Sequence, residues 1–368
     1  MSEQLWRNTV RSLEPHIPGQ ATKAAKQQLK ATNVIRLATN ENPYGPSPKA
    51  IEAMQKAIQE GHLYPDPSCW ELRDKLGRLH GIDPENYVIA NGADNIINLM
   101  IASYINPGDE VVYCAPTFSE YNKNTTIMGG IPVEVPTTTD HKFDLEAMFQ
   151  AINEKTKMVI ICNPNNPTGT ILDGDEIRGF LKRLPKHVVP ILDEAYVDFI
   201  DVNGYETGID FIKEGLPVIV LRTFSKLYGL AGMRVGYAVA NEELIKPLHM
   251  VREPFACNRV AHGGALGALD DIDYKNKVLT RNKQEMKKLV TALRNQGFEV
   301  EESHTNFIFC DMKQDTTGIA NELAERGLIV RPANIWDLPN YMRISIGTPE
   351  QNDQLLKALE EITQTAQV

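Results

Sequence analysis

Short, continuous runs of apolar and β-branched residues alternate with helical patterns through the middle of this chain. A run of four or five such residues is typical of a strand that is buried on both faces of a parallel sheet. Between the runs lie segments with helical period, such as residues 174–184. Strands that alternate with helices indicate an α/β fold with a mostly parallel sheet flanked by helices. The four clearest runs are residues 110–113, 158–162, 188–192 and 218–221.

The pattern changes near Pro254. A long charged helix is predicted over residues 275–295, and strand-like segments follow it, which is typical of a smaller α+β domain. The length of 368 residues fits two domains. We expect a large domain over residues 46–253 and a small domain built from residues 1–45 and 254–368, in which the first 30 or so residues are helical. The strand-like segments are residues 297–302, 306–311, 328–332 and 341–347, and residues 34–37 enter the fold after the N-terminal segment.

The charge balance excludes several functions. The chain has 38 Lys and Arg against 48 Asp and Glu, a net charge of −10, whereas a protein that holds nucleic acid needs a basic face. The same balance disfavours a polybasic membrane-surface role. No apolar run approaches the roughly 20 residues that span a bilayer, and the start MSEQLWRN lacks the features of a secretory signal. We expect a cytoplasmic protein whose partners are small molecules, not nucleic acid or membranes.

Cysteine and histidine spacing supports neither a disulfide framework nor a metal site. The five cysteines are scattered and never form a CxxC pair, and none of the eight histidines lies in an HExxH pattern. Cys114 and Cys162 lie at the ends of apolar runs, and we interpret them as core thiols.

Polar residues follow three of the predicted strands, at the edge where open parallel sheets bind ligands. The second run leads into the amide-rich turn 163–169, the third into Asp193-Glu194-Ala195-Tyr196, and the fourth towards Lys226. Alone, these are ordinary features: a β-turn, a helix N-cap and a surface lysine. However, a carboxylate at the end of a buried strand is costly unless it meets a cation, and a lysine in a dry pocket can form a Schiff base.

Possible anion-binding residues lie near these strand ends. Gly92-Ala93-Asp94 opens a predicted helix whose free backbone N–H groups would favour an anion, although an Asp-capped helix is the ordinary alternative. Ser225 stands beside the lysine, and Arg234 lies in the glycine-rich segment 229–236. A serine and an arginine together can hold a phosphate.

Together these residues predict pyridoxal phosphate as the cofactor. This cofactor needs a lysine, a carboxylate facing its ring nitrogen, a phosphate site and an aromatic ring over its face. Lys226, Asp193 and the anion-binding residues supply the first three, and Phe118 in Pro116-Thr117-Phe118 supplies the fourth. The ordinary explanations would all have to hold at once, so we interpret the chain as a pyridoxal-phosphate enzyme.

The whole chain resembles the fold-type I, class I and II aminotransferases, and most closely the histidinol-phosphate aminotransferase family. The lysine and proline–asparagine motifs are specific for the aminotransferase fold. NENPYGP and YPDP narrow the resemblance to this family, although its aromatic-amino-acid relatives share them. The matching segments are residues 40–46, 64–67, 91–94, 116–118, 163–169, 193–196, 223–226, 229–236 and 341–348.

The resemblance implies a role for each matching cofactor residue. Lys226 would hold the cofactor as an internal aldimine and then move the substrate proton, and Asp193 would pair with the ring nitrogen. Tyr196 and Asn166 would hydrogen-bond the phenolic oxygen, and Phe118 would stack on the ring. The phosphate would be held by Ser225, Arg234, the backbone of Ala93 and Asp94, and Tyr64 from the neighbouring subunit of a homodimer.

The resemblance also assigns substrate anions to two arginines. Arg343 would clamp an α-carboxylate, and Met342, Ile344 and Ile346 share the opposite face of its predicted strand. Histidinol phosphate has no α-carboxylate, so Arg331 would help one site accept both its phosphate and the carboxylate of glutamate. Without the family, either arginine could be a surface charge. The other substrate residues implied are Asn42, Tyr44 and Asn166.

The reaction implied is transamination from L-histidinol phosphate to 2-oxoglutarate by a ping-pong mechanism, giving imidazole acetol phosphate and L-glutamate in histidine biosynthesis. An aromatic aminotransferase acting on phenylalanine or tyrosine is the close alternative. An amino-acid-phosphate decarboxylase with the same cofactor is a second, and a non-enzymatic regulator a third. Two departures from the family pattern bear on the substrate: His16 lies where an N-terminal tyrosine is usual, and Asn95 replaces an acidic residue.

Overall fold

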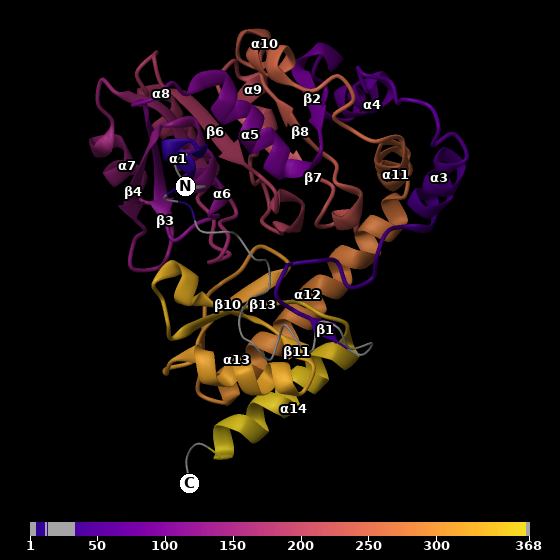
Figure 1. Cartoon of the computed structure of the whole chain (residues 1–368). Coiled ribbons are helices and arrows are strands. Elements are labelled where there is room, and N and C mark those ends of the chain that lie inside the picture. The colour runs from indigo at the N-terminus through magenta and orange to yellow at the C-terminus, as the bar shows by residue number, and fades with distance from the viewer. Residues whose placement is uncertain (1–4, 12, 14–33, 366–368) are drawn as a thin grey trace.

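The computed structural model describes residues 5–11, 13 and 34–365. Its larger part is built on a seven-stranded sheet surrounded by helices (Figure 1). The last five strands of the sheet order run parallel, and β8 runs antiparallel to both of its neighbours. The expected α/β fold with a mostly parallel, mixed sheet is therefore confirmed. In sheet order the strands are β2 (Tyr87–Ala90), β8 (Gly236–Val239), β7 (Ile219–Thr223), β6 (Val189–Asp193), β5 (Thr156–Cys162), β3 (Glu110–Ala115) and β4 (Ile131–Pro136).

The four predicted strands are β3, β5, β6 and β7, with bounds that differ by one or two residues. They could be predicted because their side chains are almost all buried, which keeps the apolar runs continuous. β2 and β8 have only four residues each, and β4 mixes exposed and buried positions at the sheet edge. These three strands therefore lie outside the predicted runs.

Several helices begin at a residue whose side chain caps the first turn, whereas α5 has no side-chain cap. α8 begins at Gly174, as predicted, because the Glu176 N–H donates to Asp173 Oδ1 (2.8 Å) and the Asp173 N–H donates to Glu176 Oε2 (2.9 Å). α5 begins at Gly92, in the predicted anion-binding turn. The helices around the large sheet are α3 (Pro48–Ile58), α4 (Trp70–His80), α5 (Gly92–Tyr104), α6 (Glu120–Met128), α7 (Leu145–Ala151), α8 (Gly174–Arg183), α9 (Gly208–Lys213), α10 (Glu242–Val251) and α11 (Arg259–Leu269).

The C-terminal part contains a four-stranded antiparallel sheet, in the order β12-β13-β10-β9. β1, from the N-terminal segment, pairs in parallel with β11 in a separate two-stranded sheet. The single strand predicted over residues 328–332 is wrong: the chain changes sheets at Val330 and forms two short strands. The elements are β1 (Ile35–Arg36), β9 (Glu299–Val300), β10 (Phe307–Asp311), β11 (Leu328–Ile329), β12 (Arg331–Pro332), β13 (Tyr341–Ser345), α12 (Ile272–Asn295), α13 (Thr316–Glu325) and α14 (Pro349–Thr365).

The two largest hydrophobic cores correspond to these two parts. The core of the large sheet extends from Ala50 to Ala268, and the second core combines Leu37 with residues 289–362. α12 runs from one part to the other (Figure 1). The first core thus extends through α11, beyond the boundary expected at residue 253, and the division into domains stays a prediction.

The predicted N-terminal helix is represented by α1 (Asn8–Arg11). Most of that segment, including His16, lies outside the described residues. None of the helices described has the length and apolar composition needed to cross a membrane. Cys114 and Cys162 are buried in the first core, as expected, and all five cysteines are free.

Candidate active site

A cavity of about 410 Å³ lies at the carboxyl ends of β5, β6 and β7 and is closed on its far side by β12 and β13. Eleven of the fourteen predicted site residues line it. They come from the large sheet, from the start of α5 and from the C-terminal sheet. These residues are Ala93, Asp94, Phe118, Asn166, Asp193, Tyr196, Ser225, Lys226, Arg234, Arg331 and Arg343.

Lys226 enters the cavity from the turn that follows β7. Its Nζ donates to the carbonyl oxygen of Thr39 (3.3 Å) and lies 5.4 Å from the centre of the Tyr196 ring. Gly229 has φ of +68°, and a Cβ there would meet Gly45 O at 2.3 Å. Only glycine allows this approach, which brings the 40–46 segment against the lysine turn.

Asp193 is fully buried at the end of β6 without a cationic partner among the described residues. Oδ2 accepts a hydrogen bond from the Tyr121 hydroxyl (2.6 Å), and Oδ1 accepts one from the Ala195 N–H (3.0 Å). Burial raises the pKa of this carboxyl to about 6. A buried carboxylate is costly unless hydrogen bonds and a positive group offset the loss of water, so the residue fits a ligand that carries a protonated ring nitrogen.

The Tyr196 hydroxyl is fixed by a residue of the NENPYGP segment. It accepts a hydrogen bond from Asn40 Nδ2 (2.9 Å), and both side chains are buried. Asn166 also lines the cavity, and its Oδ1 accepts a hydrogen bond from Arg343. Tyr196 and Asn166 thus present polar groups to the cavity next to Lys226 and Asp193.

The start of α5 and the glycine-rich segment meet at Arg234. Arg234 Nη1 donates to Ser225 Oγ (3.3 Å), and Nη2 donates to Asp94 Oδ2 (2.8 Å). Gly92 has φ of +83°, and a Cβ there would lie 2.5 Å from Arg234 Nη2. The guanidinium therefore rests against the first turn of a 13-residue helix, whose free N–H groups favour an anion. This arrangement fits a phosphate group.

Arg331 and Arg343 are direct cross-strand neighbours on β12 and β13. Arg343 is buried, and two of its nitrogens donate to Asn166 Oδ1 and Ala38 O. Its Nε has no hydrogen-bond partner among the residues that the structure describes. Burial lowers the pKa of both arginines, that of Arg343 to about 10 with a contribution from Arg331. Because like charges directly opposite each other are destabilising, the pair fits an anionic substrate group.

The face predicted for Arg343 on its strand is confirmed. Met342, Ile344 and Ile346 belong to the second hydrophobic core, whereas Arg343 lines the cavity. The alternation of side chains along the strand produces this separation.

Three predicted residues do not line the cavity in this single copy of the chain. Asn42 Nδ2 donates to Leu227 O (2.8 Å), and its Oδ1 accepts from the Tyr44 N–H (2.9 Å), so Asn42 braces the lysine turn. The Tyr44 hydroxyl is buried and has no hydrogen-bond partner in the described part of the chain. Tyr64 is 78% exposed, and its ring stacks on Phe255 at 4.4 Å. The substrate and phosphate roles of these residues stay predictions.

Three further residues shape the cavity and are absent from the sequence prediction. Tyr121 lies in the first turn of α6, three residues after Phe118 of the preceding loop, and their rings meet edge to face at 5.9 Å. It acts on the cavity through its hydrogen bond to Asp193, a contact that no local spacing indicates. Asn40 belongs to a matching motif, but nothing in that motif specifies its contact with Tyr196. Trp336 lies in a loop, and no local pattern indicates its position.

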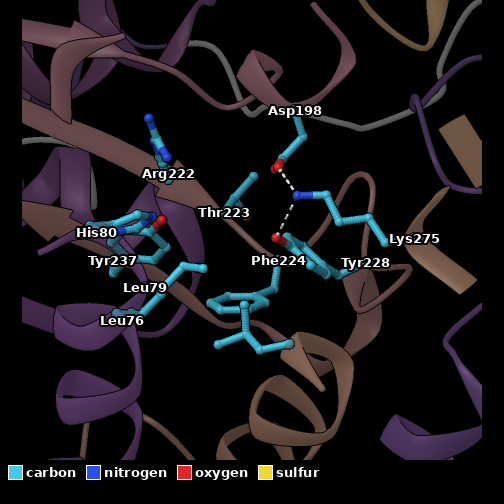
Figure 2. Close-up of a pocket in the computed structure, with 11 residues that line it drawn as sticks. Leu76, Leu79, His80, Asp198, Arg222, Thr223, Phe224, Tyr228, Tyr237 and Lys275 are labelled. Atoms are coloured by element: carbon cyan, nitrogen blue, oxygen red, sulfur yellow. Dashed lines mark hydrogen bonds and ion pairs between the residues drawn. The ribbon is translucent and has the colours of Figure 1, made fainter. Parts of the chain in front are cut away.

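A separate cavity of about 240 Å³ lies beside Arg222 and Phe224 of the β7 strand end (Figure 2). Lys275, in the first turn of α12, forms an ion pair with Asp198 (2.8 Å), and its Nζ lies 3.5 Å from the Tyr228 hydroxyl. The cavity contains none of the predicted site residues. Its polar contacts attach the beginning of α12 to the large part of the molecule.

The fold and the site define an aminotransferase. The chain belongs to the family described as aminotransferase class I and II, whose model matches residues 32–359. A histidinol-phosphate aminotransferase from Moorella thermoacetica is 42% identical over 97% of this chain and 92% of its own length. A second, from Caldicellulosiruptor saccharolyticus, is 38% identical over 97% of this chain and 100% of its own. Within the class, the chain is therefore a member of the histidinol-phosphate aminotransferase family.

A solved structure agrees with this assignment. The histidinol-phosphate aminotransferase from Sinorhizobium meliloti, determined in complex with pyridoxal-5'-phosphate, has a TM-score of 0.91 to this chain. The two sequences are 27% identical, and the match covers 98% of each chain. The resemblance identified from the sequence is confirmed in both family and fold.

Proposed function

We propose that this aminotransferase uses pyridoxal phosphate to transfer the amino group of L-histidinol phosphate to 2-oxoglutarate. The products would be imidazole acetol phosphate and L-glutamate, formed by a ping-pong mechanism in histidine biosynthesis. The observation that carries the proposal is the cross-strand pair Arg331 and Arg343, which faces Lys226 in one cavity. The similarity to named histidinol-phosphate aminotransferases along nearly the whole chain supports it.

The cofactor would be held at five points. Asp193 would face its ring nitrogen, Phe118 would cover its ring, and Lys226 would hold it covalently. Tyr196 and Asn166 would hydrogen-bond its phenolic oxygen. When bound, pyridoxal phosphate supplies an electron sink for negative charge at the substrate Cα. The phosphate would be held by Ser225, Arg234 and the backbone of Ala93 and Asp94.

Lys226 would also move the proton that transamination requires. Its Nζ hydrogen-bonds only to a backbone carbonyl and has no carboxylate partner among the described residues, so it is free to accept a proton from the donor Cα. The buried Tyr196, with its hydroxyl fixed by Asn40, would orient the reacting groups. The Tyr196 ring centre lies 5.4 Å from Lys226 Nζ.

The two arginines would serve both half-reactions. L-Histidinol phosphate presents a phosphate, and glutamate presents carboxylates, so the same cations must accept either anion. Arg343 is fixed by Asn166 and Ala38, while Arg331 has no ion pair among the described residues. An arginine fork suits both phosphate and carboxylate. Asn42 and Tyr44 would contribute indirectly, because they brace the lysine turn.

We further propose that the functional unit is a homodimer, located in the cytoplasm, in which Tyr64 completes the phosphate site of the partner subunit. Tyr64 and Phe255 expose a stacked aromatic pair. Ile58, Leu63 and Met250 of neighbouring segments are also more than half exposed. Exposed apolar side chains in such numbers favour a protein–protein contact.

The donor specificity can be tested by single half-reactions. The holoenzyme is mixed with L-histidinol phosphate or L-phenylalanine, and conversion of the cofactor is followed by its absorbance. We expect kcat/KM for histidinol phosphate to exceed that for phenylalanine. Faster conversion by phenylalanine would replace the proposal with the aromatic aminotransferase. Release of carbon dioxide from an amino-acid phosphate without a keto-acid acceptor would replace it with the decarboxylase.

A further inference from the structure

Trp336 stands between two neighbouring cavities. It ends the short helix η5 (Ala333–Trp336). Along the chain, η5 connects β12, the strand of Arg331, with β13, the strand of Arg343. The indole lines the cavity of Lys226 and also a larger cleft of about 1160 Å³, which we call the outer cleft. The two cavities share Phe118, Ser119, Arg331, Ile335 and Trp336.

A hydrogen bond fixes the indole across the gap between the two parts of the molecule. Trp336 Nε1–H donates to the carbonyl oxygen of Thr117 (2.9 Å), which lies in the loop after β3. The Thr117 hydroxyl in turn donates to Asn165 Oδ1 (2.8 Å) in the amide-rich turn. Thr117 directly precedes Phe118, so the bond fixes the indole relative to the ring that would cover the cofactor.

The indole also contacts the proposed anion-binding arginine. The guanidinium carbon of Arg343 lies 5.5 Å from the Trp336 ring and 5.5 Å from the Phe307 ring. Such distances are typical of a cation held by aromatic rings. Any substrate whose anionic group meets Arg343 therefore has Trp336 beside it.

We propose that Trp336 discriminates between amino donors by providing the wall against which a donor's planar ring packs. The inference rests on the proposed function, since it takes the anionic group of the donor to meet Arg331 and Arg343. A flat aromatic wall binds a ring-bearing donor by stacking or edge contact. Glutamate has no ring, so the wall contributes little to its binding. Trp336 thus acts on specificity and not on the chemical step.

The test compares half-reactions of the holoenzyme carrying Trp336→Ala or Trp336→Phe. For Trp336→Ala, we expect KM for L-histidinol phosphate to rise about tenfold, the loss that a ring contact accounts for, with kcat nearly unchanged and KM for L-glutamate within about twofold. Trp336→Phe keeps a ring and should show a smaller rise. Trp70→Phe, a half-exposed tryptophan outside both cavities, is the matched control.

Fluorescence provides a readout that does not depend on turnover when the enzyme is first converted to its pyridoxamine-phosphate form, with which neither amino donor reacts. The chain has three tryptophans, Trp6, Trp70 and Trp336, so the double variant Trp6→Phe, Trp70→Phe leaves the cavity indole as the single emitter. Its emission should change and saturate with L-histidinol phosphate, with a smaller change for L-glutamate. Equal responses to both ligands, or an equal rise in both KM values for Trp336→Ala, would overturn the inference.

A wrong substrate assignment can be distinguished from a wrong role for Trp336. If the wild type converts L-phenylalanine but not L-histidinol phosphate, the proposed function is wrong. A selective rise in KM for phenylalanine over glutamate in Trp336→Ala would then still support the role of the indole. An unselective rise would overturn the inference as well.

Discussion

The hydroxyl of Tyr121 donates a 2.6 Å hydrogen bond to Oδ2 of Asp193, and both side chains are buried. Burial raises the pKa of the tyrosine far above its usual value of 10, so the hydroxyl remains a donor at every working pH. It stabilises the ionised form of the aspartate against the effect of burial. Tyr121 is thus a positioning residue for the carboxylate that would face the cofactor.

Tyr121→Phe should weaken cofactor binding. Removing the donor raises the pKa of Asp193 above about 6, so a larger neutral fraction is present near pH 7 and the acid limb of the activity profile moves to higher pH. A hydrogen bond to a charged group contributes about 1.5–3 kcal/mol, so the cofactor Kd should rise at least about tenfold. Tyr104→Phe, which removes a hydroxyl bonded to Leu244 O, is the control. An unchanged Kd and pH profile would refute this role.

Lys226→Ala should abolish turnover while the protein stays folded. The lysine makes one hydrogen bond, to Thr39 O, so little folding energy is lost with it. We expect the thermal midpoint of the apoenzyme to change by only a few degrees, and the absorbance band of the lysine-bound cofactor to disappear. Residual transamination at the wild-type rate would contradict the assigned role.

Arg331→Gln should weaken substrate binding without lowering the stability of the protein. The substitution removes one of two like charges that face each other across β12 and β13, a contact worth roughly 0.2–1 kcal/mol. Without substrate the variant should be as stable as the wild type or slightly more so, as measured by thermal unfolding. In half-reactions its KM for L-histidinol phosphate should rise at least about tenfold. A marked loss of stability would instead assign Arg331 a structural role.

Tyr64 can be assigned to one subunit or the other by complementation. Lys226→Ala and Tyr64→Ala are each expected to be impaired as homodimers. If Tyr64 acts across the interface, unfolding and refolding the two together yields mixed dimers with one intact site, and activity returns. No recovery, with mixed dimers shown by mass spectrometry, would place Tyr64 in the site of its own subunit.

The buried ion pair of Arg222 and Glu194 should be essential for stability. Glu194 Oε2 lies 2.7 Å from Arg222 Nη2, and Oε1 accepts from the Gly208 N–H (2.6 Å). Breaking such a pair typically costs 3–5 kcal/mol, because one charge is left buried alone. We expect Arg222→Met to lower the free energy of unfolding by about that amount in urea. Adding Glu194→Gln should recover part of the loss, and a larger loss in the double variant would contradict this account.

The sequence predicts strands in which nearly every residue is buried. It does not predict strands whose sheet partner lies far away along the chain. β5 was predictable because every residue but one is buried. Residues 328–332 have the same apolar character, yet they divide between two sheets because β11 pairs with β1, almost 300 positions earlier. A local pattern contains no information about such a partner.

The same distinction applies to the site. Lys226 and Asp193 follow buried strands, so their position at the sheet edge can be predicted. Tyr44 belongs to a matching motif, but its side chain is turned away from the cavity towards Arg281, whose guanidinium carbon lies 4.8 Å from its ring. Trp336 reaches the cavity only because η5 crosses to Thr117, 219 positions away.

The contacts of Asn40 have a consequence for synthesis of the chain. Its N–H donates to Ser345 Oγ, 305 positions later, and its carbonyl accepts from Asn306. At a translation rate of about 5–20 residues per second, the ribosome needs roughly 15–60 seconds to cover that distance. The segment that contains Asn40 is therefore synthesised well before β13, the strand that it contacts. A nascent chain arrested before β13 can complete the large sheet, together with every residue proposed to hold the cofactor, and still lack Arg343.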